Sequence, residues 1–257
     1  DVLGSRGLGD VYKRQVWNNQ YHHEGITYEL GQHGFARDME FQLTYEEDNA
    51  LIYTLESSQE TLNKYPFPFV LEIGYRLKGN RIEVMWSIQN TGDKEMHFQI
   101  GAHPAFYYRN LDLATHKRGY LDFGKKHTDL EYISPAEKGC VSGKRHILHT
   151  ENGIMELTSD TFMCDTYMFD NSQLQKITLM DKEQKPYISL EFSSPLVAVW
   201  SPSAVHPDVP FVCIEPWYGR CDKVGYQGEF KNREWMQHLA PNKSFTTSYS
   251  IIIEDIE

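Results

Sequence analysis

The chain has 257 residues, of which 40% are hydrophobic, and a formal net charge of −11 at pH 7. This length suits one large domain, and the negative charge disfavours nucleic acid or an anionic membrane surface as a partner. The sequence shows neither a signal sequence at its start nor the run of roughly 18 apolar residues that a membrane helix needs. We expect a cytoplasmic protein with reduced thiols, although a disulfide stays possible among the four cysteines, Cys140, Cys164, Cys213 and Cys221.

Residues 1–15 differ from the rest of the chain. They are rich in glycine, follow neither the helical nor the strand period, and end in the polar Lys13-Arg14-Gln15. We interpret them as a foreign segment, disordered or derived from cloning or sequencing, and predict that the folded domain spans residues 16–257.

Alternating hydrophobic residues predict strands over most of the remaining chain. The alternation is clearest in residues 69–77 and 82–88, which the turn Lys78-Gly79-Asn80 joins as a hairpin. Further strands are expected at residues 98–101, 174–180, 188–192, 197–200, 211–215 and 245–253. One short helix is expected at residues 57–62, where Ser57 and Glu60 have the spacing of a capping box. The pattern predicts an all-β fold, a single antiparallel sandwich.

Two ionisable residues stand directly before prolines, each close to an apolar run. His103 precedes Pro104, and Glu215 precedes Pro216. Because a residue before proline is extended and proline has no N–H, we expect both at strand ends or bulges. One acid and one base held by stiff backbone are the minimum for general acid–base chemistry. The alternatives are a satisfied core histidine at position 103 and a buried structural ion pair at Glu215.

A second histidine lies in the segment Gln32-His33-Gly34-Phe35-Ala36-Arg37-Asp38. Gly34 permits a tight backbone turn beside His33, and Arg37 supplies planar hydrogen-bond donors nearby. Taken alone this motif is weak, because a lone histidine beside glycine is more often a surface or packing residue.

Four segments together resemble the aldose 1-epimerase (galactose mutarotase-like) superfamily, and its LacX-like branch in particular. In chain order they are residues 33–38 (HGFARD), 65–69 (YPFPF), 100–106 (IGAHPAF) and 212–219 (VCIEPWYG). The resemblance implies a β-supersandwich of the galactose mutarotase type and interconversion of the anomers of a hexose without a cofactor. Because members of that family begin with further strands, we expect a sandwich that lacks its N-terminal strands and has exposed edges.

The resemblance also implies roles for individual residues. Glu215 looks like the general base that takes the proton of the C1 hydroxyl, and His103 like the general acid that protonates the ring oxygen. We expect these two groups on opposite sides of the sugar ring. His33 looks like a helper that hydrogen-bonds near the ring oxygen. Asp165 looks like a ligand of a sugar hydroxyl, with Asp170 as a competing candidate.

Three further residues are candidates for substrate binding. Phe35 and Trp217 could stack on the apolar face of a sugar, although packing within the sheet explains them equally well. Arg37 is the one motif residue that could bind a phosphate, as a hexose-6-phosphate 1-epimerase would require.

Two other function classes remain as alternatives. A non-catalytic carbohydrate-binding or sensing module would need aromatic platforms but no matched acid and base. A metal-dependent isomerase would need closely spaced ligands, and neither His22-His23 nor His97 with His103 has that spacing. We therefore expect no metal and a small-molecule hexose as partner, and the sequence fixes no oligomeric state.

Overall fold

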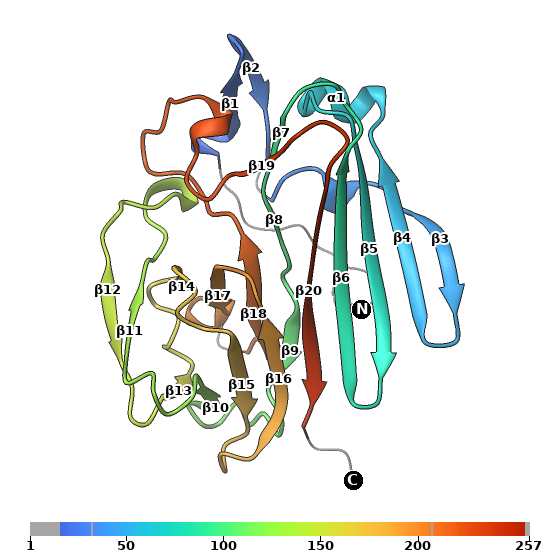
Figure 1. Cartoon of the computed structure of the whole chain (residues 1–257). Coiled ribbons are helices and arrows are strands. Elements are labelled where there is room, and N and C mark those ends of the chain that lie inside the picture. Colours follow the sequence, from blue (N-terminus) through green and yellow to red (C-terminus); the bar gives the residue numbers. More distant parts are fainter. Residues whose placement is uncertain (1–15, 32, 207, 255–257) are drawn as a thin grey trace.

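The computed structural model describes residues 16–31, 33–206 and 208–254 (Figure 1). Within these residues the larger sheet has nine strands in the order β13-β10-β15-β16-β20-β6-β5-β4-β3. The long strands β4, β5, β6 and β20 stand side by side on the right of Figure 1. The strand bounds of this sheet are β3 (Gln42–Glu47), β4 (Ala50–Glu56), β5 (Phe69–Lys78), β6 (Arg81–Asn90), β10 (Lys117–Asp122), β13 (Ile154–Thr158), β15 (Lys176–Met180), β16 (Pro186–Phe192) and β20 (Ser244–Ile253).

A smaller sheet forms the second layer and carries the candidate site. Its order is β14-β17-β18-β8, and β9 also pairs with β18. The bounds are β8 (Ile100–Gly101), β9 (Ala105–Tyr107), β14 (Thr166–Phe169), β17 (Leu196–Trp200) and β18 (Phe211–Tyr218). Three two-stranded ribbons are β1 (Gln20–His23) with β2 (Ile26–Glu29), β7 (Met96–Phe98) with β19 (Gln237–Leu239), and β11 (Asp129–Tyr132) with β12 (His146–His149).

The helical segments of the described residues are short. They are the α-helix α1 (Gln59–Lys64) and the 3₁₀ turns η1 (Trp17–Asn19), η2 (Ala36–Asp38), η3 (Glu137–Gly139), η4 (Pro202–Ala204) and η5 (Phe230–Asn232). No helix among the residues described has the length and apolar character needed to cross a membrane.

The main hydrophobic core lies between the two sheets. Alternate residues of the larger sheet, such as Leu71 and Ile88, pack in one cluster with Val199 and Ile214 of the smaller sheet. The smaller sheet also buries its other face, where Leu196, Ala198 and Trp217 join a second cluster. Burial on both faces explains why β17 and β18 read as continuous apolar runs rather than as alternating ones.

The structure confirms the predicted all-β fold and its clearest hairpin. β5 and β6 pair in register from Phe69–Asn90 to Lys78–Arg81, so Gly79 and Asn80 form the turn. The predicted strand at residues 98–101 was wrong in one respect. The chain pairs with β19 up to Phe98 and with β18 from Ile100, so two strands replace one.

The predicted capping box is displaced by one residue. The N-cap is Ser58, whose side chain accepts a hydrogen bond from the backbone N–H of Thr61, and the Thr61 hydroxyl accepts one from the Ser58 N–H. Ser57 instead accepts a hydrogen bond from the backbone N–H of Phe69 at 3.1 Å, which explains why it is not the cap.

Two other expectations can be compared with the structure. The four cysteines are free thiols, as predicted. The interpretation of residues 1–15 lies outside the described residues, and the expected lack of N-terminal strands stays a prediction.

Candidate active site

Glu215 lies in the middle of β18. Its strand neighbour is Ala198 of β17, and the strand continues through Pro216 to Tyr218. The prediction that Glu215 ends a strand was therefore wrong. Its side chain is fully buried, which is costly for a carboxylate unless another group compensates the charge.

His103 occupies a break in the sheet opposite Glu215. On one side of the break Gly101 pairs with Trp217, and on the other side Ala105 pairs with Cys213. Between them Ala102 donates to the carbonyl of Pro216 at 3.1 Å, and Ile214 donates to the carbonyl of Pro104 at 3.3 Å. Because Pro104 has no N–H for a regular ladder, the strand is interrupted at His103 without a change of register. Of the predicted strand end or bulge, the structure shows the former, because His103 lies between the end of β8 and the start of β9.

The two side chains meet directly. His103 Nε2 lies 3.0 Å from Glu215 Oε1, and the two side chains are 11% and 0% exposed. The arrangement joins an imidazole and a carboxylate that are 112 positions apart in the chain. We expected Glu215 and His103 on opposite sides of a sugar ring, and this direct contact does not fit that expectation. Since the hydroxyl and the ring oxygen of an anomeric centre are bonded to the same carbon, an adjacent donor and acceptor can serve both.

Two aromatic rings flank His103. The ring of His33 lies edge-on to it with a centroid separation of 6.5 Å. His33 and Gly34 both have positive φ, 74° and 71°, which is the tight turn that Gly34 was expected to permit. The ring of Trp200, at the end of β17, lies 5.5 Å from that of His103 and is partly exposed. The structure thus brings His33, His103 and Glu215 together.

Trp200 is a candidate that sequence reasoning missed. The strand at residues 197–200 was predicted, but only the pairing of β17 with β18 shows that its last residue lies near Glu215. That pairing puts Trp200 opposite Cys213, two positions from Glu215. A tryptophan that ends an apolar strand just before a Ser-Pro turn was the available signal.

The acid–base pair has a thiol beside it. Donor atoms of His103, Cys213 and Glu215 all lie within 4.8 Å of one another. An imidazole, a thiol and a carboxylate are donor types that zinc accepts, so these three residues are the ones that could hold a cation here. Their geometry equally suits proton transfer between the imidazole and the carboxylate.

The two aromatic residues predicted from the motifs lie in different surroundings. Phe35 is partly buried, packs on Tyr65 and Phe69, and lines an apolar cavity of about 110 Å³ together with His33. Trp217 is 1% exposed, and its Nε1 donates to the carbonyl of Ala102 at 3.3 Å. The packing alternative therefore describes Trp217 in this structure.

The polar candidates also separate. Arg37 is exposed in η2 and forms an ion pair with Asp38 at 3.1 Å. Asp165 is exposed at the start of β14, next to Thr166, which pairs with Trp200. Asp165 therefore lies at the same end of the sheet as the Trp200 ring, and its Oδ1 accepts a hydrogen bond from the Thr166 hydroxyl at 2.5 Å.

Asp170, at the opposite end of β14, is buried in a network of cations. Arg145 binds both of its carboxylate oxygens, and Arg220 lies 3.9 Å from one of them. The hydrogen bond to Asp170 raises the pKa of Arg145, whereas burial lowers the pKa of Arg220. The carboxylate of Asp170 is therefore already paired with Arg145 and Arg220.

Comparison with known proteins gives a consistent result. A family model described as aldose 1-epimerase matches residues 13–251, which include all of the site residues above. The chromosomal LacX protein of Lactococcus lactis subsp. lactis is 26% identical over 231 residues, which are 87% of this chain and 75% of that protein.

Solved structures agree. A galactose mutarotase related enzyme from Lactobacillus acidophilus superposes with a TM-score of 0.86 at 28% identity, covering 96% of this chain and 82% of its own. A galactose mutarotase-like protein from Lactobacillus casei gives a TM-score of 0.85 at 26% identity, covering 97% and 83%. These superpositions confirm the predicted galactose mutarotase type of sandwich.

Proposed function

Because this chain belongs to the aldose 1-epimerase family, we propose that it interconverts the α and β anomers of a hexose by general acid–base catalysis. The observation that carries the proposal is the contact of His103 Nε2 with Glu215 Oε1 at 3.0 Å, formed at a break in the sheet. A sensing module would need the aromatic rings of this site, but would have no use for a matched acid and base.

The reaction needs one proton removed and one delivered. The Glu215 carboxylate takes the proton of the C1 hydroxyl while the bond between C1 and the ring oxygen breaks. The His103 imidazolium gives its proton to the departing ring oxygen, which leaves an open aldehyde. Rotation about the C1–C2 bond presents the other face of the aldehyde, and the same groups in reversed roles close the ring. Each positioned group of this kind contributes about 10²–10⁴ in rate.

Three neighbouring residues are proposed to bind the sugar. The partly exposed ring of Trp200 offers an apolar face beside His103. We assign to His33, whose ring is 6.5 Å from that of His103, a hydrogen bond near the ring oxygen. Asp165, exposed near Trp200, is our choice over Asp170 for a sugar hydroxyl, because arginines already hold Asp170.

The substrate we propose is an unphosphorylated hexose. A phosphorylated sugar needs a cationic partner, and Arg37 forms an ion pair with Asp38. The net charge of −11 also opposes the approach of a dianion.

Polarimetry tests the proposal. We expect the optical rotation of freshly dissolved α-glucose or α-galactose to decay faster in the presence of the protein. Glu215→Gln and His103→Asn should each slow the catalysed rate by about 10²–10⁴. His149→Asn is the matched control, since His149 is exposed and also faces a carboxylate, Asp129 at 2.7 Å.

Three outcomes would contradict parts of the proposal. Sugar binding without acceleration by the wild-type protein would favour the sensing module. A faster decay with glucose 6-phosphate than with glucose would assign the phosphorylated substrate. Full activity of Glu215→Gln, with the fold intact by circular dichroism, would remove this carboxylate from the chemistry.

A further inference from the structure

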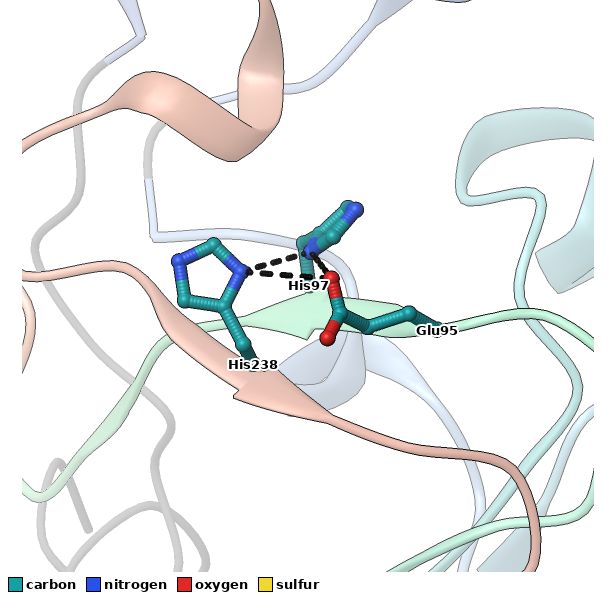
Figure 2. Close-up of side chains that lie close together, drawn as sticks. All are labelled: Glu95, His97 and His238. Atoms are coloured by element: carbon teal, nitrogen blue, oxygen red, sulfur yellow. Dashed lines mark hydrogen bonds and ion pairs between the residues drawn. The ribbon is translucent and has the colours of Figure 1, made fainter.

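A second cluster of ionisable side chains lies outside the candidate active site. It contains Glu95, His97 and His238, whose donor atoms all lie within 4.8 Å of one another (Figure 2). None of these residues takes part in the proposed proton transfer. From their geometry we infer that Glu95, His97 and His238 form a binding site for a divalent transition-metal ion of the zinc type.

Strand pairing brings these three side chains together. His97 in β7 stands directly opposite His238 in β19, and directly opposed side chains of an antiparallel pair are close neighbours. Glu95 is two positions before His97, so it faces the same side of the extended chain. Figure 2 shows the Glu95 carboxylate and both imidazoles converging above the two strands. Because the two histidines are 141 positions apart, sequence spacing could not reveal this site.

The distances match the size of a metal ion. The two Nδ1 atoms of His97 and His238 are 2.9 Å apart, and Glu95 Oε2 lies 3.9 Å from each of them. A triangle with these edges has a point about 2.1 Å from all three corners, which is the length of zinc–imidazole and zinc–carboxylate bonds. Small side-chain movements would turn this planar set into three corners of a tetrahedron.

The donor types and their exposure agree with this assignment. Two imidazoles and one carboxylate suit zinc and similar ions better than calcium or magnesium, which prefer oxygen. The side chains of His238 and Glu95 are 46% and 56% exposed, so an ion can reach the site and a water can complete its coordination. The His97 side chain is 6% exposed and fixes the inner side of the site.

A third histidine lies beside this cluster. The ring of His23 is 6.0 Å from that of His97, and its buried Nδ1 has no hydrogen-bond partner among the described residues. Such an ion would link β7 to β19. β7 leads through β8 to His103, and β19 is the last strand but one.

Zinc titration of the whole chain tests the inference. The protein, freed of any histidine tag and of bound metal with a chelator, is titrated with zinc chloride by calorimetry and heated with and without the ion. We expect one equivalent to bind and the melting temperature to rise, because an ion that binds only the folded chain stabilises it. Calcium chloride at the same concentration should do neither.

Variants locate the site. His238→Gln and Glu95→Gln remove exposed ligands, and we expect each to weaken zinc binding by about tenfold or more and to abolish the thermal shift. His149→Gln, an exposed histidine beside Asp129, is the matched control and should bind zinc like the wild type. Equal zinc affinity in wild type and His238→Gln would overturn the inference. So would the absence of zinc binding by the wild type, which would leave His97 and His238 as a hydrogen-bonded pair.

Discussion

Two aspartates at opposite ends of β14 show how the surroundings decide the role of a residue. Asp165 is exposed beside Trp200, whereas the side chain of Asp170 is 3% exposed and bound by arginines. Removing the charge of Asp170 takes away the buried anion that Arg145 and the buried Arg220 share, and leaves them only the more exposed Glu131 and Glu234. We expect Asp170→Asn to lower the free energy of unfolding by on the order of 3 kcal/mol. Urea denaturation measures this loss.

Asp165→Asn should behave in the opposite way. Loss of one hydrogen bond from a charged group to the sugar should raise KM about tenfold. The urea midpoint should stay near that of the wild type, because exposed substitutions usually change stability by less than about 0.5 kcal/mol. If Asp170→Asn were as stable as the wild type but had a raised KM, Asp170 rather than Asp165 would be the sugar ligand.

At this scale the sequence predicted the residues that local backbone chemistry fixes. The prolines after His103 and Glu215 and the glycine after His33 drew attention to these residues, and the family resemblance supplied their predicted roles. Trp200 and the pair of His97 with His238 could not be found in this way. His238 is 141 positions from His97, and Trp200 gains its place near Glu215 only from the pairing of β17 with β18, so the sheet register is needed in both cases.

Among the elements, β8 is the short strand that sets the position of His103. A Cβ atom at Gly101 would lie 2.5 Å from Cδ1 of Trp217 and 3.2 Å from the carbonyl oxygen of Pro216. The Trp217 ring therefore lies against the backbone of β8 and needs glycine there. We expect Gly101→Ala to lower the free energy of unfolding by about 1–3 kcal/mol through overpacking. It should also reduce kcat, because the break that holds His103 begins at the next residue.

Gly31→Ala is the matched control for this substitution. A Cβ atom at Gly31 has no neighbour within 4 Å among the described residues, so stability and kcat should both stay near the wild-type values. Thermal unfolding and the polarimetric assay measure the two quantities on the same samples. Wild-type stability in Gly101→Ala would mean that Trp217 can move away without cost.

The elements differ in how far the sequence predicts them. The hairpin of β5 and β6 follows from alternation and a glycine-containing turn, which are local signals. The division between β7 and β8 is not local, because the chain changes partner from β19 to β18 at Gln99. The same limit applies to β18, where pairing with β17 carries the strand through Pro216.

Across the whole molecule, the burial of tyrosines makes the stability of the sandwich depend on pH in the alkaline range. Burial is the largest cause that raises the pKa of several tyrosines above its ordinary value, among them Tyr21, Tyr65, Tyr108, Tyr167 and Tyr187. They come from many parts of the chain, so their rings report on the core as a unit. A pKa that is higher in the folded state means that the unfolded chain loses these protons first.

The raised pKa values predict that the folded state loses stability as the pH rises. Burial raises the pKa of Tyr187 from 10.0 to about 12, so its contribution is complete below pH 10 and is lost as pH rises toward 12. That loss amounts to about 3 kcal/mol for this residue, since one pKa unit corresponds to about 1.4 kcal/mol. We expect cooperative unfolding above about pH 10, with tyrosinate absorbance and loss of circular dichroism rising together. Tyr187→Phe should make the fall in stability between pH 10 and 12 shallower, whereas Tyr107→Phe, at an exposed ring, should not. Tyrosinate absorbance that rises fully before the fold is lost would show that these phenols ionise within the folded protein.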